Sequence, residues 1–374
     1  MIKQSFSLIP RIIGYNMFRN FGRPIMMPMN YTLAITNVCN SRCKTCFIWN
    51  FYNKNPKLKN NELTTEEFQK LFKSIGRSPV WVTISGGEPF IRNDLSEICI
   101  MLNDICHPQI VNIPTNSILA DRVINQTKEI LKNVDYNLVV NLSLDNIDKK
   151  HDEIRGTPGN FNIVMKVYKQ LKELRKKYDN FQLGIHSVIS NFNIKDLSEI
   201  YEFVRKLNPD SYITEIAEER SELFNFNKDI TPNANEYTEF IEQLITKINR
   251  DYLHSKRQIS KVTQSFRIYY YKLASEILKQ KRQVIPCFAG VASCQISPFG
   301  DVWPCCVLGY NKSFGNLREV DFDFKKIWKS KRAEEIRKFI KNKKCYCPLA
   351  NAHYTNMLCN LKALMKITSK VVKL

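Results

Sequence analysis

The sequence predicts an α/β fold on a parallel sheet, either an incomplete barrel or an open sheet. Short runs rich in β-branched and apolar residues alternate with amphipathic stretches of helical period, which is the pattern of βαβ units. The chain has 374 residues, 44% of them hydrophobic and 25% charged. That length and composition provide a large core, exclude disorder throughout, and favour an appended module beside the main domain.

Six strands are expected, each followed by a helical stretch. In the first of these stretches Thr64 and Glu67 have capping-box spacing, and apolar residues follow at helical period. Beyond the last strand, long amphipathic patterns predict a helical connector over 225–285. Residues 286–360 hold seven of the twelve cysteines and form a predicted cysteine-rich module. The predicted strands are 31–36, 80–85, 109–114, 138–144, 182–189 and 211–216.

The charge and the cysteine content narrow the class of protein. The 56 basic and 36 acidic residues give a net charge of +20, which indicates an anionic partner or surface. Twelve cysteines without a signal-peptide pattern favour reduced thiols in the cytosol, where clustered cysteines indicate metal ligands or redox groups. Five scattered histidines argue against a histidine-based metal site, and no apolar run is long enough for a membrane-spanning helix.

Three cysteines follow the first predicted strand within one loop. Cys39, Cys43 and Cys46 have the spacing C-x3-C-x2-C. Three thiolates can hold three irons of a cubane and leave the fourth iron open to a small molecule. The alternative is a zinc site or a structural cluster. Zinc needs four ligands, and no fourth cysteine or histidine lies nearby in the sequence.

This loop, with Phe47 beside its last cysteine, resembles the hallmark of the radical S-adenosylmethionine (radical SAM) superfamily. The second predicted strand ends in Ser85-Gly86-Gly87-Glu88-Pro89, which is similar to the family's GGEP element. The glycines would let the strand end approach a ligand closely, and the Glu88 carboxylate could accept hydrogen bonds from an α-ammonium group. The resemblance implies a partial (β/α)6 TIM-like barrel over 31–224 that binds a [4Fe-4S] cluster and S-adenosylmethionine (SAM).

By the same resemblance, polar residues that follow the later strands are expected to contact SAM. Ligands collect at the carboxyl ends of strands in parallel α/β folds. Ser143 and Asp145 would contact the ribose or methionyl part, and Arg155 the carboxylate. Each of these residues could instead be a capping or surface residue. The expected cofactor-binding set is Gly86, Gly87, Glu88, Pro89, Thr115, Asn116, Ser143, Asp145, Arg155 and Asn193.

The cysteine-rich module resembles the SPASM or twitch extension of radical SAM proteins, which holds auxiliary iron-sulfur clusters. At least one auxiliary [4Fe-4S] cluster is therefore expected, and Cys294 or Cys359 could replace one of its ligands. A four-cysteine zinc site is the alternative. Cys306 is expected to pack beside the cluster, and Cys99 and Cys106 to lie in the core. The expected ligands are Cys287, Cys305, Cys345 and Cys347.

Both ends of the chain are basic and amphipathic. Residues 1–30 and 361–374 each hold four basic residues and no acid. In the C-terminal segment the lysines lie opposite an aliphatic face, which is typical of a helix in a membrane interface. The alternative is that both ends pack on the barrel and merely expose their charges. The basic residues are Lys3, Arg11, Arg19, Arg23, Lys362, Lys366, Lys370 and Lys373.

The resemblance implies an enzyme that takes one electron from a reductant such as ferredoxin or flavodoxin. It would cleave SAM to methionine and a 5′-deoxyadenosyl radical, which abstracts hydrogen from an unactivated C–H bond. The basic ends favour a location in the cytoplasm on the inner face of the membrane and a membrane lipid or other hydrophobic substrate. One outcome would be C–C bond formation between hydrocarbon chains. No RNA-binding module is recognisable, which argues against nucleic acid.

Three alternatives stay open. The first is a peptide maturase that forms thioether or C–C crosslinks, although thirty residues ahead of the barrel are expected to leave no room for a leader-binding domain. The second is a twitch-type radical dehydrogenase. The third is a non-enzymatic iron-sulfur electron carrier.

Overall fold

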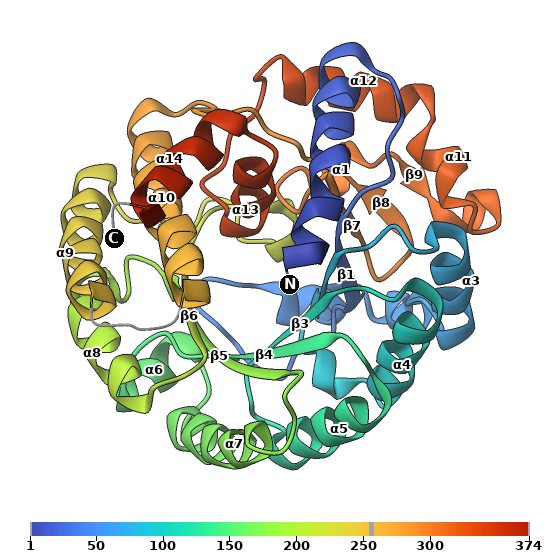
Figure 1. Cartoon of the computed structure of the whole chain (residues 1–374). Coiled ribbons are helices and arrows are strands. Elements are labelled where there is room, and N and C mark those ends of the chain that lie inside the picture. Colours follow the sequence, from blue (N-terminus) through green and yellow to red (C-terminus); the bar gives the residue numbers. More distant parts are fainter. Residues whose placement is uncertain (1, 254–257, 373–374) are drawn as a thin grey trace.

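The structure, a computed structural model, describes residues 2–253 and 258–372, and the side chains of residues 8–250 and 262–368. Its described strands form one open sheet in the order β6-β5-β4-β3-β2-β1-β7-β8-β9 (Figure 1). The strands are β1 (Asn30–Thr36), β2 (Trp81–Gly86), β3 (Ile110–Thr115), β4 (Asn137–Ser143), β5 (Phe181–Ile189), β6 (Ser211–Ile216), β7 (Ser293–Ile296), β8 (Asp301–Trp303) and β9 (Gly315–Asn316).

The six predicted strands are confirmed, each within one residue at either end. Strands β1 to β6 pair in parallel, and helices surround the curved sheet (Figure 1). Strands β1 and β4 are buried along almost their whole length, as expected for a parallel sheet covered on both faces. Since the sheet is open, the partial-barrel prediction is also confirmed.

Fourteen α-helices lie in the described part of the chain, and two of them, α9 and α10, occupy the predicted connector. The helices are α1 (Ile2–Phe21), α2 (Phe51–Lys54), α3 (Thr65–Ile75), α4 (Leu95–Cys106), α5 (Ala120–Asn133), α6 (Asp148–Arg155), α7 (Asn160–Arg175), α8 (Leu197–Leu207), α9 (Ala234–Leu253), α10 (Gln258–Gln280), α11 (Phe324–Trp328), α12 (Lys331–Lys341), α13 (Ala350–Leu358) and α14 (Leu361–Val372).

The cysteine-rich module continues the barrel's own sheet, which the sequence did not indicate. Strand β7 pairs in parallel with β1, and β8 and β9 follow as antiparallel strands. A second link joins the module to α3. There the predicted capping box forms between Thr64 and Glu67, and the Glu67 carboxylate also accepts two bonds of 2.7 Å from Arg318. The module is therefore held against the first βαβ unit of the barrel.

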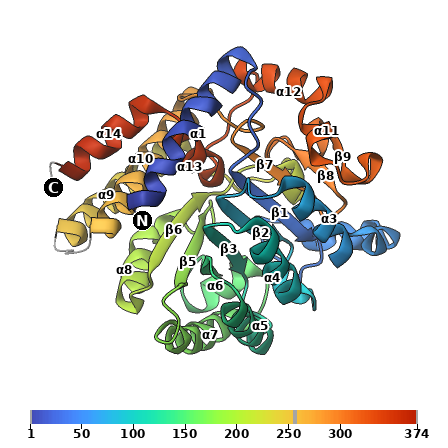
Figure 2. The same ribbon diagram turned by 45° about the vertical axis from the view of Figure 1, so that its right-hand side comes forward.

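Both ends of the chain pack on the rest of the protein, which favours the second of the two interpretations of their amphipathic patterns. Helix α1 runs through Pro10 without a break and buries Tyr15 and Phe18. Helix α14 buries Ala363 and Ile367, and it contacts α10. Figures 1 and 2 both place α1 and α14 on the same side of the molecule as α10 and α13. The aliphatic face of α14 thus meets protein along its described part.

Two of the basic residues at the N-terminal end bond to the protein itself. Arg11 donates to the Ser78 carbonyl at 2.6 Å, and Arg19 to the Cys287 carbonyl at 2.9 Å. Lys373 and the side chains of Lys3 and Lys370 lie outside the described residues. Among the helices that the structure describes, none has both the length and the apolar character needed to cross a bilayer.

Candidate functional site

The three loop cysteines lie directly after β1, at the carboxyl end of the parallel strands. Cys43 is buried, and Cys39 and Cys46 are partly exposed. Burial raises the pKa of the Cys39 thiol to about 12 and also raises that of Cys46. Such thiols are unreactive alone and ionise when a metal supplies positive charge. The donor set therefore fits a metal cluster better than a nucleophile.

Backbone contacts with α6 fix the shape of this loop. The Arg42 N–H donates to the Arg155 carbonyl at 3.1 Å, and the Lys44 N–H donates to the Ile154 carbonyl at 2.9 Å. Gly156 makes this close approach feasible, because a Cβ there would overlap the Arg42 carbonyl. The loop therefore takes its geometry from a helix more than one hundred residues later in the chain.

Side chains near the loop contact two of its sulfurs. The Ser41 hydroxyl lies 3.1 Å from the Cys43 sulfur, and the Asn116 amide lies 3.9 Å from the Cys39 sulfur. The Asn116 amide also donates to the Asn40 side chain at 2.8 Å. Asn116, predicted from the sequence as a cofactor residue, is thus placed beside the cysteines. Only their position between the cysteines could have indicated that Ser41 and Asn40 belong to the site.

The two glycines of the GGEP element lie against the start of the cysteine loop. The Gly87 N–H donates to the Thr36 carbonyl at 2.7 Å, and the Glu88 N–H donates to the Val38 carbonyl at 2.9 Å. A Cβ on Gly86 would overlap the Thr36 carbonyl oxygen, and one on Gly87 would overlap that of Val38. The close approach that the glycines permit is therefore to the chain's own backbone. It sets the distance between β2 and the cysteines.

Gly87→Ala should lower the free energy of unfolding by about 3 kcal/mol, because the new methyl group meets backbone that cannot rotate away. It should also reduce the iron bound at the loop. Gly76→Ala is the matched control: its Cβ meets nothing within 4 Å, so only its backbone conformation, with φ 54° and ψ −144°, is penalised, at about 2 kcal/mol. Urea denaturation and iron analysis measure both effects. Equal losses in the two variants would contradict the steric argument.

Glu88 joins the ends of β2 and β3. One carboxylate oxygen accepts from the Thr115 hydroxyl at 2.8 Å and the Phe90 N–H at 3.2 Å, and the other accepts from the Asn116 N–H at 2.7 Å. Burial raises the pKa of Glu88 to about 7. These bonds occupy much of its acceptor capacity and use the Thr115 hydroxyl. A contact with the SAM ammonium stays a prediction. The neighbouring Pro89 is buried.

Asp145 and Arg155 form a buried ion pair after β4. Their side chains meet at 3.0 Å, and the second Asp145 oxygen accepts from the Val188 N–H at 2.8 Å. The Arg155 Nε is buried without a hydrogen-bond partner. An unpaired buried donor fits the expected contact with an anionic part of SAM. The charges of Cys43 and Asp145 raise the pKa of Arg155 although burial opposes them.

Two other predicted cofactor residues have different surroundings. The Asn193 amide donates to the carbonyls of Asp145 and Val188 at 2.7 and 2.8 Å, and its oxygen accepts from the Ser190 N–H. Asn193 therefore holds the turn after β5 in shape. Ser143 lies at the end of β4, partly exposed, opposite His186 of β5.

A hydrogen-bond relay that the sequence did not reveal runs behind the ion pair. The His151 Nδ1 accepts from the Asp145 N–H at 3.1 Å, and its Nε2 lies 3.0 Å from the Asn160 Oδ1. The Asn160 amide donates to the Asn116 carbonyl at 3.0 Å. Burial lowers the pKa of His151, so a neutral ring with the proton on Nε2 fits these bonds. The relay links the residues after β3 to those after β4.

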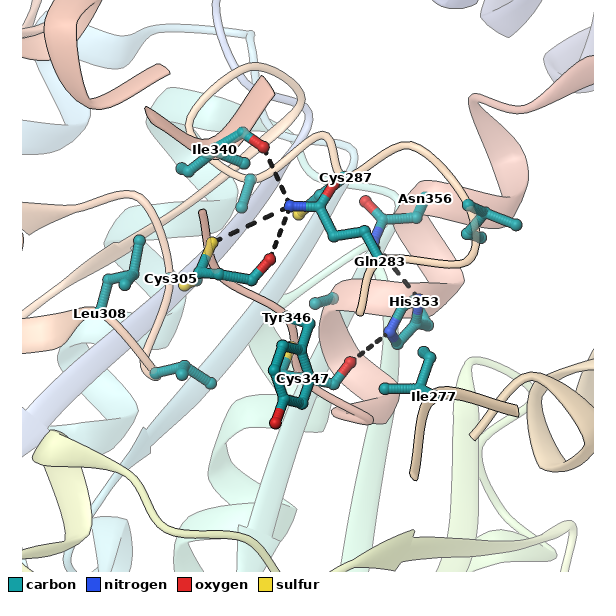
Figure 3. Close-up of a pocket in the computed structure, with 15 residues that line it drawn as sticks. Ile277, Gln283, Cys287, Cys305, Leu308, Ile340, Tyr346, Cys347, His353 and Asn356 are labelled. Atoms are coloured by element: carbon teal, nitrogen blue, oxygen red, sulfur yellow. Dashed lines mark hydrogen bonds between the residues drawn. The ribbon is translucent and has the colours of Figure 1, made fainter. Parts of the chain in front are cut away.

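The four expected auxiliary ligands line one pocket (Figure 3). Gln283 donates to the carbonyls of Ile340 and Cys345 at 2.9 Å, and His353 bonds to the Cys347 carbonyl at 2.7 Å. These bonds hold the two late cysteines in place. Cys294 on β7 and Cys359 after α13 are buried outside this pocket. The pocket's cysteines are Cys287, Cys305, Cys345 and Cys347.

The spacing of the donors bears on which metal would fit. Within the described side chains, no three His, Cys, Asp or Glu groups converge closely enough to hold a single ion. A zinc ion needs four ligands within about 2.3 Å of one point, whereas a cubane separates its thiolates across a larger volume.

Cys347→Ala should remove about half of the iron, since it deletes a ligand of only one of the two expected [4Fe-4S] clusters. The spectral change on adding SAM should persist, because it belongs to the loop cysteines. Anaerobic reconstitution, iron analysis and electron paramagnetic resonance provide the measurement. Cys359→Ala, which lies outside the pocket, is the control and should keep all the iron. Full iron content in Cys347→Ala would refute this ligand assignment.

A largely buried charged group at the end of β6 and directly after it lies between the two cysteine sites and was not predicted. Arg220 pairs with Glu215 at 3.0 Å and approaches the Cys306 sulfur at 3.9 Å. Burial raises the pKa of Glu218 to about 8, and the pKa of Glu222 is raised too. The run of charges that begins at Glu215, inside the predicted strand 211–216, was the available signal. The group consists of Glu215, Glu218, Arg220 and Glu222.

The same segment connects both cysteine sites. The Asn225 amide donates to the Thr45 carbonyl in the cysteine loop at 3.0 Å and to the Glu218 carbonyl at 3.1 Å. The Glu222 carboxylate accepts from Gln295 of β7 at 2.6 Å. The charges of Glu222 and Glu218 raise the thiol pKa values of Cys46 and Cys347, respectively, in addition to burial. The charged group thus faces both metal-ligand sets.

Comparisons with protein families match this division of the chain. A family model described as the radical SAM superfamily matches residues 33–204. A second, SPASM, described as an iron-sulfur cluster-binding domain, matches residues 287–348. The first range contains the loop cysteines, and the second contains the four cysteines of the pocket.

Two curated relatives differ in how much of the chain they match. The antilisterial bacteriocin subtilosin biosynthesis protein AlbA of Bacillus subtilis is 23% identical over 361 residues, which are 93% of this chain and 71% of that protein. A probable GTP 3′,8-cyclase of Methanococcus vannielii is 30% identical over 236 residues, 61% of this chain and 71% of that protein.

Solved structures share the fold. Streptococcus suis SuiB bound to its precursor peptide SuiA superposes with a TM-score of 0.61 at 17% identity, covering 96% of this chain and 77% of SuiB. The protein anSMEcpe with bound AdoMet gives a TM-score of 0.59 at 16% identity, covering 92% and 98%. At these identities the likeness is one of fold.

Proposed function

Since the chain belongs to the radical SAM superfamily and carries a SPASM domain, we propose that it modifies a peptide by radical chemistry at an unactivated C–H bond. It is an enzyme, and its cofactors are SAM and [4Fe-4S] clusters, at least one of them auxiliary. Cys39, Cys43 and Cys46 would hold the cluster that supplies the reducing electron and, with SAM, the hydrogen-abstracting radical. The residues around them position SAM.

The observation that carries the peptide assignment is the extent of the similarity to AlbA. It spans 93% of the chain and so includes both cysteine regions, whereas the similarity to the cyclase spans 61%. AlbA is named for the biosynthesis of a bacteriocin, and SuiB is described with a precursor peptide. A peptide substrate therefore replaces the lipid that the basic ends favoured.

The chemistry of the charged group supports a polar substrate. Glu218 and Arg220 lie between the cysteine sites, and the buried Glu218 Oε1 and Arg220 Nε lie 4.0 Å apart, an ion pair too long for a hydrogen bond. A hydrocarbon chain placed against them would leave both groups unsatisfied, which costs about 1–3 kcal/mol each. A peptide amide carries one donor and one acceptor and can bond to both.

A lipid or other hydrophobic membrane substrate is the second candidate, and one observation favours it. Ile9, Ile13, Met17 and Phe21 recur every four residues on α1 and are 45–80% exposed. Regularly spaced exposed apolar residues on a surface helix are typical of an interaction surface. This stripe lies on the outer surface of the molecule.

The test supplies both substrates to the same preparation. Anaerobically reconstituted enzyme is incubated with SAM, dithionite and either short peptides encoded beside its gene or lipid vesicles. With the correct peptide, 5′-deoxyadenosine formation should rise, and the peptide should lose two hydrogen atoms on crosslinking. A rise with lipid vesicles alone, with a matching loss of lipid hydrogen, would transfer the assignment to the lipid.

A further inference from the structure

A basic groove opens between the C-terminal end of α1 and helix α12. Its volume is about 420 Å³. The charged residues that line it are six basic residues and one acid, so its net charge is strongly positive. They are Arg19, Arg23, Lys329, Arg337, Lys338 and Lys341, with Glu334 as the acid.

This groove shares a wall with the auxiliary pocket. Cys287, Ala289 and Ile340 line both spaces. Arg19 extends from α1 to the Cys287 carbonyl, 2.9 Å away, and its guanidinium lies 5.5 Å from the Phe288 ring centroid. The basic groove and the auxiliary pocket are therefore adjacent, with Cys287 between them.

The basic residues of the groove divide into two groups. Arg337 is held inside by bonds to the carbonyls of Gly290 and Trp328 at 2.6 and 2.7 Å, so it shapes the floor. Lys338 and Lys341 are exposed at the rim, where Lys338 pairs with Glu334 at 2.8 Å and Lys341 donates to the Asn20 carbonyl at 2.7 Å. Arg23 and Lys329 are exposed there as well, and neither forms an ion pair within the described residues.

We propose that this groove, lined by the residues named above, is the docking site for an acidic one-electron carrier protein. The inference rests on the radical SAM assignment, not on the peptide substrate. Each SAM cleavage consumes one electron, so the carrier is oxidised by one electron and the enzyme is reduced by one, with no bond formed between them. Acidic carriers match a basic rim, and opposite charges speed encounter and fix orientation.

The position of the groove selects this partner over an anionic membrane. Electron delivery requires the donor to approach a redox site, and Cys287 connects the groove to one. Phe21, 80% exposed at the rim, adds the aromatic contact common in protein interfaces. A membrane would gain nothing from proximity to that cysteine.

The test reverses two rim charges with Lys329→Glu/Lys338→Glu in the reconstituted holoenzyme. The matched control is Lys128→Glu/Lys132→Glu, which makes the same charge change at exposed positions on α5, across the molecule from α12 (Figure 1). Flavodoxin is the probe. Calorimetry gives its Kd at low and high salt, and 5′-deoxyadenosine formation is followed with reduced flavodoxin and, separately, with dithionite.

The groove variant should weaken flavodoxin binding about tenfold or more at low salt, with a smaller effect at high salt. Its rate with dithionite should match the wild type, and the α5 control should bind flavodoxin nearly as the wild type does. Equal Kd values for the two variants would overturn the proposal. A groove variant that binds flavodoxin as the wild type does, but loses binding to anionic vesicles, would also overturn it. If dithionite gave no SAM cleavage in any protein, the enzymatic assignment would fail while the Kd comparison still decided the docking site.

Discussion

Replacing Cys39, Cys43 and Cys46 together by alanine is expected to lower the rate of SAM cleavage by at least about a thousandfold, because the cofactor carries the difficult chemistry. The described residues near the loop offer no substitute donor set. Ser41 and Asn116 contact two of the sulfurs, but neither is a thiolate. Without the three thiolates, no cluster should form at this site.

The measurement combines iron content, the spectrum with and without SAM, and 5′-deoxyadenosine formation. The variant should keep the auxiliary iron and lose the spectral response to SAM. A double Cys99→Ala/Cys106→Ala variant is the matched control, since both residues are fully buried on α4. It should lose some stability but no iron. Normal turnover in the triple variant would refute the assignment of the loop.

The loop cysteines were predictable because their chemistry depends on spacing within a few residues. The pocket cysteines were predicted only through resemblance, since Cys287 and Cys347 are sixty residues apart and nothing local joins them. The structure supplies the missing bonds, from Gln283 to the Cys345 carbonyl and from His353 to the Cys347 carbonyl. Long-range contacts of this kind leave no periodic trace in a sequence.

The pairing of β7 with β1 could not be predicted for a related reason. Strand β7 has four residues and β8 has three, too few to show an alternating pattern.

The C-terminal helix shows the opposite problem. Its amphipathic pattern was correctly recognised, but a pattern cannot distinguish a lipid from α10 as the surface that covers the apolar face. Ile367 is buried within the protein.

The burial of the charged group at the end of β6 could not be predicted from the sequence. A run of acids and one arginine normally indicates a solvated surface. In the structure Glu218 and Glu222 are both buried, because the cysteine-rich module covers them. Gln295, which bonds to Glu222, comes from that module. Their role therefore depends on tertiary packing that the local sequence does not encode.

The second large effect is expected from Arg155→Met. The Asp145 side chain is 1% exposed, and Arg155 is its ion-pair partner at 3.0 Å. Removing one member of a buried pair leaves an uncompensated charge, which costs about 3–5 kcal/mol. The free energy of unfolding should fall by that amount. SAM affinity should fall as well, because the unpaired Arg155 Nε disappears.

A second variant separates the lost charge pair from lost packing. In Asp145→Asn/Arg155→Met the buried charge is gone, and the asparagine oxygen can still accept from the Val188 N–H. This double variant should recover part of the lost stability but none of the lost SAM affinity. The control is Lys176→Met, which breaks the exposed pair with Glu173 and should change stability by less than about 1 kcal/mol. Urea denaturation and SAM titration measure both quantities. An Arg155→Met variant no less stable than Lys176→Met would show that Asp145 does not need its partner.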